Sequence, residues 1–452
     1  MSSDSLNKLE KRSIFALASV YGLRMYGLFL ILPVLAIYAE NLEGATPLLM
    51  GVALGVYGIS QALFQIPFGI MSDRFGRKPI ILIGLAIFVI GSLVAAASTT
   101  ITGVILGRAL QGAGAIAAVV LALTSDLTRE NQRTKAMAMI GMTIGFSFML
   151  ALITAPWLEF FISVPGLFVM TAILAALSMG VIVKVVPTPV QTVNLDVRPI
   201  PIRMLQLLRH RQLIRLDLGI FVLHFVLTAM FVAVPIILLQ ELNLETKAHW
   251  SVYLPALLVS IVLMVPLIVI SGKKERVEGI FFAAVCLLLL SQFMFLVRPL
   301  GSLGLTICLV VFFWGFNLLE AMLPSLVSRV APAACKGSAM GVYNTFQFLG
   351  IFFGGLFGGL LYGSFGVNAV FALSGLLLLL WATVLHTSPR MVLLDSIVIR
   401  VNPNANYCCK TALEKVDGVE EVIIIDGESV AYLKVDKSKL DQVALDQIIM
   451  NR

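Results

Sequence analysis

The stretch GIMSDRFGRK, residues 69–78, joins two long apolar runs at about residues 47–71 and 79–98. Each run is long enough for a membrane-spanning helix, which needs roughly 20 apolar residues. The stretch is therefore expected to be a very short loop at the membrane surface. Basic residues that anchor helix ends and glycines that make a tight turn explain most of it. They do not explain Asp73, which stands four residues before Arg77.

The composition extends this interpretation to the whole chain. Of its 452 residues, 59% are hydrophobic and 13% are charged, whereas soluble proteins carry about 25% charged residues. The net charge of +7 arises from cations in short loops, and no basic patch with interleaved aromatic residues occurs. We therefore expect a multi-pass membrane protein embedded in a lipid bilayer, with no nucleic-acid partner.

The apolar runs predict an all-α membrane protein with twelve transmembrane helices. They lie at about residues 14–39, 47–71, 79–98, 101–124, 135–158, 165–186, 213–240, 250–271, 278–297, 302–327, 337–362 and 366–387. The first run is too long for a signal peptide and lacks a small-residue cleavage site, so we expect it to be a retained helix. The five cysteines are scattered and indicate neither a disulfide framework nor a metal site.

The cations predict how the chain is oriented. With twelve spans, both termini lie on one side of the membrane. The loops and ends on that side hold 20 Lys and Arg residues, whereas the opposite loops hold only Lys247 and Arg298. Short loops rich in Lys and Arg stay in the cytoplasm. We therefore expect both termini in the cytoplasm and the protein in the inner membrane.

The longest polar connection, residues 187–212, contains four prolines and divides the membrane part into halves at 1–186 and 213–388. The halves resemble each other at an offset of about 200 residues, since PFGIMS at 67–72 aligns with PLIVIS at 266–271. Repeated halves are common in transporters, which bind their substrate at the interface of the repeats. Three charges are specific to the first half: Asp73 (opposite Gly272), Asp126 (opposite Leu326) and Arg24 (opposite His224).

The composition changes after Pro389. Residues 396–401, 421–425 and 430–435 have strand patterns, and residues 406–416 and 440–450 have helix patterns. This β-α-β-β-α order predicts a small ferredoxin-like domain over residues 389–452 in the cytoplasm. The pattern resembles heavy-metal-associated domains, but Cys408 and Cys409 are adjacent and point about 100° apart on a helix. We expect regulation or self-association through this domain, or a passive tail, rather than metal binding.

These features together resemble the major facilitator superfamily, and within it the YajR-type transporters. The signature of its short loop is Gly-x-x-x-Asp-Arg-x-Gly-Arg-Lys, and the chain has every position of it: Gly69, Asp73, Arg74, Gly76, Arg77 and Lys78. The segment from Arg108 to Gly114 resembles the span-four motif of proton-coupled members. Span five has Gly141, Gly145 and Pro156 but departs from the Gly-Pro antiporter motif, which leaves the direction of transport open.

Ionisable residues inside the spans are candidates for function, because each costs roughly 2.5 to 3.5 kcal/mol at the bilayer centre. Arg24 and Glu320 lie about ten residues from the cytoplasmic ends of their spans. We interpret Glu320 as a group that takes and releases a proton, against the alternative of a structural carboxylate. Arg108 is either a proton-coupling residue, as its motif implies, or a helix-packing cation bonded to backbone carbonyls.

Uncharged polar residues mark a predicted substrate pocket around Arg24. Its other members are Tyr57, Gln61 and Gln65 on span two, Asn317 on span ten, and Tyr343 and Gln347 on span eleven. Hydrogen bonds between helices explain some of them without a ligand. Glycines at four-residue spacing, at 51 and 55, 141 and 145, and 350, 354 and 358, predict close helix packing.

The resemblance also implies a conformational latch at the quoted loop. Asp73 and Arg77 are four residues apart and can pair on a helix. The family pattern implies that Asp73 also meets Asp126 through Arg77, and the N-terminus of span eleven across the two halves. Such a latch would close the cytoplasmic side and stabilise the outward-open state.

The sequence thus predicts a secondary active transporter that moves, and more specifically exports, a small organic compound with protons as the coupling ion. An importer of a small anionic metabolite held by Arg24 is one alternative, and a ligand sensor that signals through the C-terminal domain is another. No nucleophile and base, nucleotide loop or metal cluster can be assembled from the sequence, so we expect neither an enzyme nor a cofactor.

Overall fold

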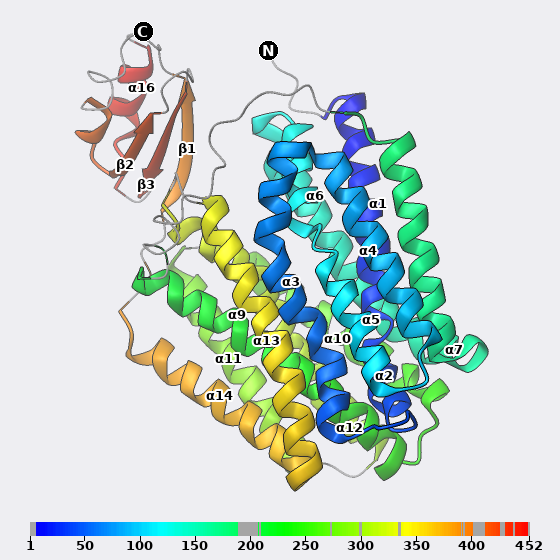
Figure 1. Ribbon diagram of the computed structural model, residues 1–452. Coiled ribbons are helices and arrows are strands. Elements are labelled where there is room, and N and C mark those ends of the chain that lie inside the picture. The colour runs from blue at the N-terminus through cyan, green and yellow to red at the C-terminus, as the bar shows by residue number, and fades with distance from the viewer. Residues whose placement is uncertain are drawn as a thin grey trace.

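A computed structural model of the chain is a bundle of long helices with a small α/β domain at one end (Figure 1). The structure describes residues 6–188, 207, 209–271, 274–297, 301–332, 336–389, 391, 394–400, 412–424, 430–436 and 439–450. We call the end of the bundle that carries the small domain the domain end, and the opposite end the far end. Helix α1 also begins at the domain end (Figure 1).

The first half of the bundle contains α1 to α7. Their bounds are α1 Lys8–Phe29, α2 Leu32–Ala39, α3 Pro47–Phe75, α4 Arg77–Ala97, α5 Ile101–Ala113, α6 Ala117–Asp126 and α7 Glu130–Lys184. Local chemistry sets several starts. Asn7 and Glu10 form a capping box that satisfies free backbone N–H groups of α1. Thr46 caps α3, whose first residue is Pro47, a residue that suits the first helical turn.

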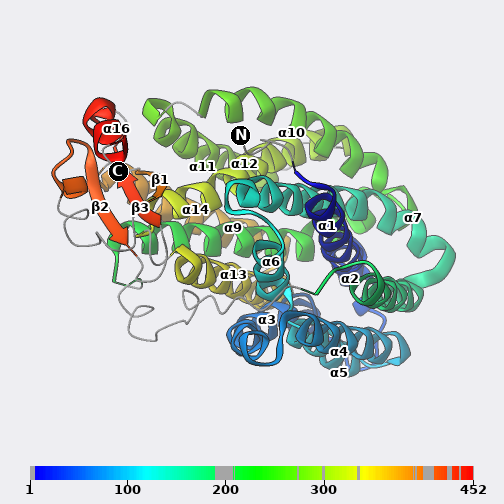
Figure 2. The ribbon, with the colours of Figure 1, turned by 90° about the horizontal axis from the view of Figure 1, so that it is seen from above.

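The second half contains α9 to α14. Their bounds are α9 Arg211–Ile236, α10 Trp250–Ser271, α11 Lys274–Val297, α12 Ser302–Val330, α13 Lys336–Phe365 and α14 Val367–Thr387. A π-helical turn, η2 Ile237–Glu241, extends α9, and the 3-10 turn η3 Thr246–Ala248 precedes α10. Seen from above, α3, α4 and α5 lie on one side of the bundle and α10, α11 and α12 on the opposite side (Figure 2).

The prediction of twelve spans in an all-α membrane fold is confirmed. Among the described residues, eleven helical segments are long and apolar enough to cross a membrane, and one of them covers 50 residues, Lys135–Lys184. That segment lies in α7, whose backbone leaves the helical region at Ser163, with φ 55° and ψ 173°. Ser163 therefore divides α7 into two spans, the fifth and the sixth.

The described parts of the C-terminal domain follow the predicted order of elements, whereas residues 406–411 of its first predicted helix lie outside them. Strands β1 Asp395–Arg400, β2 Val419–Ile424 and β3 Val430–Val435 form an antiparallel sheet in the order β1-β3-β2, and α16 Gln442–Met450 follows. Residues 412–414 at the end of the first predicted helix are helical. Cys408 and Cys409 lie outside the described residues.

Glycines show how α3 and α13 meet. A methyl group placed on Gly51 lies 2.0 Å from the Gly355 carbonyl oxygen, and one on Gly58 lies 2.4 Å from that of Phe348. These helices therefore touch backbone to backbone from the far end to mid-bundle, as the glycine spacing predicts. Gly69 lies on the same face as Gly51, five turns further on, but a methyl group there meets no described residue within 4 Å.

Helix α13 likewise changes from close contact with α3 at the far end to no contact with its described residues at the domain end. Gly341 and Gly359 are five turns apart on one face. A methyl group would collide with α3 at Gly359 but would meet no described residue within 4 Å at Gly341. We call the uncovered faces of α3 and α13 near Gly69 and Gly341 the domain-end opening. The two halves are thus closed together at the far end and apart at the domain end.

The other predicted glycine surfaces have two outcomes. Gly350 and Gly354 pack against the backbone carbonyls of Phe221 and Phe225 in α9, and Gly358 packs against Ala229 of the same helix, which confirms the prediction for this group. The prediction for Gly141 and Gly145 is wrong, because a methyl group on either residue meets no described residue within 4 Å. Spacing alone does not say which face of a helix a neighbour covers.

Candidate functional site

An aromatic cluster closes the space between the halves at mid-bundle. Phe148 of α7 packs against four other rings. The distances between ring centres are 5.1 Å to Phe29, 6.3 Å to Phe231, 6.2 Å to Phe313 and 6.3 Å to Phe316. These rings come from α1, α7, α9 and α12, hence from both halves. They form an apolar seal between the far end and the polar groups described next.

Glu320 and His224 lie just on the domain side of this seal. Glu320 follows Phe316 by one turn of α12, and its Oε2 is 3.8 Å from Nε2 of His224 in α9. The Glu320 side chain is 39% exposed, while that of His224 is 7% exposed. Glu320 is therefore an acid within the membrane part that keeps access to solvent in this conformation.

Gln347 of α13 completes this group. His224 Nδ1 is 3.3 Å from the Ile220 carbonyl oxygen, and its Nε2 is 2.8 Å from Nε2 of Gln347. When Nδ1 donates to that carbonyl, Nε2 is left to accept a hydrogen bond from the Gln347 amide. The imidazole is then neutral, and Oε2 of Glu320 has no hydrogen-bond partner among the described residues. The three side chains thus offer two neighbouring atoms that can bind a proton.

Two other predicted pocket residues of this half are more enclosed. Tyr343 of α13 is buried, and its hydroxyl has no hydrogen-bond partner in the described part of the chain. Asn317 donates a hydrogen bond from Nδ2 to Ser260 Oγ in α10 at 3.2 Å. Asn317 therefore joins two helices, whereas Tyr343 retains unused hydrogen-bonding capacity.

Arg24 is held inside the first half. Its guanidinium Nη2 donates to the Gly114 carbonyl at 2.9 Å, to Gln61 Oε1 at 3.2 Å and to the Tyr57 hydroxyl at 3.3 Å. The residue is 1% exposed, and its guanidinium lies 5.2 Å from the centre of the Phe88 ring. The structure therefore brings Arg24, Tyr57 and Gln61 together, but it does not bring Arg24 to Glu320.

Arg108 forms a second buried cluster, which also contacts Tyr57. It donates to the carbonyls of Ala53 and Leu54 in α3, each at 3.3 Å, and to Gln111 at 3.0 Å. Its guanidinium also lies 5.5 Å above the Tyr57 ring. These contacts match the predicted alternative of a packing cation bonded to backbone carbonyls. Gln65, a further predicted pocket residue, is buried one turn beyond Gln61.

The loop at residues 69–78 contains a compact ion cluster. Arg77 pairs through Nη1 with Asp73 at 2.5 Å and through Nε with Asp126 at 3.1 Å, and it also donates to Ser72 Oγ at 2.6 Å. Gly76 has φ 91°, a conformation that glycine tolerates best. Lys78 donates to the Val186 carbonyl at 2.8 Å. All of these partners belong to the first half.

Asp217 is a buried acid that the sequence analysis missed. It lies in α9, two turns before His224, and is 2% exposed. Its Oδ1 has no hydrogen-bond partner among the described residues. The sequence signal for a buried acid was weak. Asp217 lies only two residues after the basic segment at 209–215, so it resembles a surface charge there.

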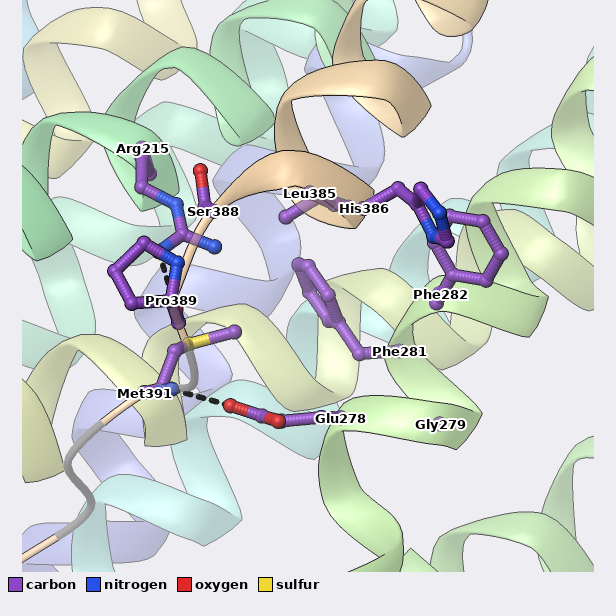
Figure 3. A pocket seen from close by; sticks show the side chains of 10 residues that line it. All are labelled: Arg215, Glu278, Gly279, Phe281, Phe282, Leu385, His386, Ser388, Pro389 and Met391. Atoms are coloured by element: carbon purple, nitrogen blue, oxygen red, sulfur yellow. Dashed lines mark hydrogen bonds between the residues drawn. The ribbon is translucent and has the colours of Figure 1, made fainter.

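A pocket of about 260 Å³ lies at the domain end of the second half, where the chain leaves α14 (Figure 3). Arg215 of α9 donates to the Pro389 carbonyl at 3.1 Å, and Glu278 of α11 accepts a hydrogen bond from the backbone N–H of Met391. Arg215 and Glu278 thus hold the connection to the C-terminal domain against two membrane helices.

The C-terminal domain also contacts the bundle directly. The side chain of Lys434 in β3 donates to the carbonyls of Ser328 and Arg329 at 3.1 and 2.9 Å. These carbonyls belong to the last turn of α12, where backbone oxygens lack partners within the helix and a positive charge is favoured. The residue is 1% exposed. The domain therefore docks on the helix that carries Glu320.

Two six-helix halves that enclose buried ionisable groups define a multi-pass membrane transporter. The chain belongs to the Major Facilitator Superfamily, which it matches over residues 17–355. It is 40% identical over 443 residues to the inner membrane transport protein YajR of Escherichia coli (strain K12), with 97% of each chain covered. It is 38% identical over 125 residues to multidrug resistance protein D of the same organism, covering 26% of this chain and 31% of that protein.

Solved structures show the same fold. A nucleoside transporter, NupG, superposes with a TM-score of 0.67 at 14% identity and covers 82% of this chain and 98% of its own. A D-xylose-proton symporter superposes with a TM-score of 0.65 at 14% identity and covers 84% of this chain and 98% of its own. At such low identity these likenesses concern the fold alone. The predictions of family, fold and a transport rather than enzymatic role are confirmed.

Proposed function

We propose that this transporter exports small organic compounds, with lipophilic cations as the first class to examine, in exchange for protons. The observation that carries the proposal is the Glu320 and His224 pair, 3.8 Å apart on the domain side of the aromatic seal. A carboxylate at this depth attracts an organic cation, and the same carboxylate binds a proton. Cation and proton therefore compete for one site, which is the requirement for exchange.

The orientation follows the positive-inside rule, with the domain end in the cytoplasm of a cell whose inner membrane holds the protein. The domain-end opening then faces the cytoplasm, and the present conformation is inward-open. In this state Glu320 is 39% exposed and can release a proton and take up the compound to be exported. Closure at the domain end and separation at the far end would present the same site to the outside.

Proton and substrate move this equilibrium only through their different affinities for the two conformations. In the outward-open state we expect the Asp73, Arg77 and Asp126 cluster to meet the domain end of α13, as the family pattern implies. The present contacts of this cluster stay within the first half. This supports a latch that is prepared but not engaged when the cytoplasmic side is open.

The buried position of Arg24 disfavours the alternative of an anion importer. All three of its hydrogen bonds use Nη2, and its Nε and Nη1 have no hydrogen-bond partner among the described residues. An anion would have to reach these donors on a residue that is only 1% exposed in this conformation. The second alternative, a ligand sensor, is favoured by the contact of Lys434 with α12, because this contact links the C-terminal domain to the helix of Glu320. A sensor would bind ligand without flux.

The test uses the purified full chain in proteoliposomes with ethidium as the probe and an imposed pH gradient. Ethidium movement should follow the gradient and release protons in return. Replacement Glu320→Gln should abolish gradient-driven movement, whereas Glu245→Gln, at a carboxylate that is 71% exposed near the far end, should have no effect. Gradient-driven movement that persists at full rate in Glu320→Gln would refute the assigned proton site.

A further inference from the structure

The pocket at the domain end contains two opposite charges that do not pair with each other. It is the space of about 260 Å³ between α9, α11 and the end of α14, and both Arg215 and Glu278 line it. Among the described residues, neither side chain takes part in an ion pair. Ionised groups make the strongest hydrogen bonds to a ligand of opposite charge. This pocket therefore suits a ligand that carries both charges.

The protein uses only part of each charged group. Arg215 donates from Nη1 to the Pro389 carbonyl at 3.1 Å, and its Nε has no hydrogen-bond partner among the described residues. Glu278 accepts a hydrogen bond through Oε1 from the backbone N–H of Met391, and no described residue donates to its Oε2. Pro389 and Met391 belong to the connection between α14 and the C-terminal domain. Arg215 and Glu278 lie on either side of this connection (Figure 3).

The pocket lies at the depth expected for lipid headgroups. Arg215 and Glu278 are each the fifth residue of their helices, α9 and α11. At 1.5 Å per residue, both charges lie within about 8 Å of a helix end. One turn deeper, Leu218 of α9 is 46% exposed, and Val384 of α14 is 44% exposed. Exposed apolar side chains on membrane helices face the acyl chains of lipids, so the charged pocket adjoins a lipid-facing surface.

The other walls of the pocket are mainly apolar and aromatic. Phe281, Phe282, Leu385 and Met391 line it together with His386. The ring centres of Phe282 and His386 are 6.1 Å apart, and His386 is exposed. A small polar metabolite would gain nothing from these walls. The glycerol and the first acyl carbons of a phospholipid would bury apolar surface against them, which is favourable.

We propose that this pocket binds the headgroup of a phospholipid that carries both a phosphate and a primary ammonium, as phosphatidylethanolamine does. The Arg215 guanidinium donates to the phosphate, since its planar fork of N–H groups matches phosphate oxygens. The ammonium donates to the Glu278 carboxylate. A purely anionic headgroup would place negative charge against Glu278, and a quaternary ammonium has no N–H to donate. The pocket thus discriminates by repulsion as well as by attraction.

The bound lipid is part of the joint between the membrane bundle and the C-terminal domain. Its headgroup contacts the same two side chains that hold Pro389 and Met391. We therefore expect the connection to be held more firmly in membranes that contain this lipid. The site does not involve Glu320, so it is independent of what is transported and of the coupling ion.

The first experiment measures lipid binding by the full chain. The protein is purified from vesicles that contain phosphatidylethanolamine, phosphatidylglycerol and phosphatidylcholine in equal amounts, and native mass spectrometry identifies the lipids that stay bound. Phosphatidylethanolamine should be retained in preference. In Glu278→Gln this retention should fall at least about tenfold, because a charge-assisted hydrogen bond is lost. In Arg215→Gln retention of phosphatidylethanolamine and phosphatidylglycerol should both fall.

Both variants are chosen to keep the contacts with the connection. A glutamine amide can still accept from the Met391 N–H or donate to the Pro389 carbonyl, so limited proteolysis near Pro389 in detergent should be unchanged. The matched control is Arg211→Gln, which removes an exposed arginine one turn earlier on α9. It should retain phosphatidylethanolamine as the unmodified protein does, because general attraction of phosphate to surface charge does not create the preference.

Two results of this experiment would overturn the proposal: equal retention of the three lipids by the unmodified protein, or an unchanged preference in Glu278→Gln. A protein dimer that retains no lipid and dissociates in Arg215→Gln would also overturn it, since the pocket would then be an interface between copies.

A second experiment distinguishes a lipid from a free compound with the same charges. Soluble glycerophosphoethanolamine at millimolar concentration should leave the retained phosphatidylethanolamine in place and should not raise the thermal unfolding temperature. If it displaces the lipid and stabilises the protein by itself, the pocket is a site for a free zwitterion and the assignment to a lipid is wrong.

Discussion

Nε of Arg77 donates a hydrogen bond to Oδ2 of Asp126 at 3.1 Å, which joins the end of α6 to the start of α4. The same guanidinium pairs with Asp73 at the end of α3. Three helix ends of the first half are therefore held by one cation. Because α3 lines the domain-end opening, this cluster is rigidly attached to a surface that must move when the opening closes.

The first prediction concerns this latch. Asp73→Asn removes one carboxylate from Arg77 and should lower transport while membrane insertion stays intact. A partly exposed ion pair contributes roughly 0.2–1 kcal/mol, so the balance of conformations should shift by up to about fivefold. Transport of ethidium in proteoliposomes measures the effect, with the exposed far-end carboxylate replaced in Glu43→Gln as the matched control. Unchanged transport in Asp73→Asn would remove the latch from the mechanism.

The second prediction concerns closure at the far end. Gly51→Ala places a methyl group 2.0 Å from the Gly355 carbonyl oxygen, so α3 and α13 must separate there. Overpacking of this kind costs typically 1–3 kcal/mol. We expect a longer distance between spin labels at Glu43 and Phe365, which both lie at the far end. Gly180→Ala is the control, because a methyl group there meets nothing within 4 Å. An unchanged label distance would mean that this contact does not hold the far end closed.

The sequence was sufficient for the membrane fold because each span is a local property. A run of about 20 apolar residues is a span wherever it lies, and Ser163, where α7 leaves the helical conformation, lies between the predicted runs 135–158 and 165–186. The ion cluster was predictable for the same reason, since Asp73 and Arg77 are one helical turn apart. Even the C-terminal sheet follows from short alternating segments between turn residues.

The candidate site was less predictable because it depends on packing between distant segments. Arg24 has the depth of a pocket residue, but its strongest partner is the carbonyl of Gly114, 90 residues away. Asp217 has the sequence context of a surface charge, but it is buried where α9 packs against other helices of the second half. Gly141 and Gly145 show the reverse, as a packing motif that no described helix covers.

The third prediction addresses the two interpretations of Arg108. Its hydrogen bonds go to two carbonyls of α3 and to Gln111, which in turn donates to Ser92 in α4. We therefore expect Arg108→Ala to weaken packing among α3, α4 and α5. Losing one partner of a buried hydrogen bond costs about 1–3 kcal/mol, so the thermal unfolding temperature should fall together with transport.

The control for Arg108 is Arg211→Ala, which removes an exposed arginine at the start of α9. Thermal unfolding in detergent and ethidium-linked proton release are measured on the same preparations. A proton-coupling role predicts a different result, with an unchanged unfolding temperature and a lower number of protons released per ethidium. That outcome would reject the packing interpretation.

The fourth prediction concerns the contact between the C-terminal domain and α12. Lys434 is buried and holds two carbonyls in the last turn of the helix that carries Glu320. Lys434→Met keeps most of the apolar stem and removes the three N–H donors, so the domain should separate from α12 while its sheet stays folded. Limited proteolysis near Pro389 should become several times faster, since undocking exposes the connection. Lys439→Met, at an exposed position of the same domain, should be cleaved at the original rate.

If Lys434→Met is cleaved no faster, the contacts of Arg215 and Glu278 with the connection are sufficient to hold the domain. If transport changes along with cleavage, the domain influences the conformational cycle through α12, which a passive tail would not do.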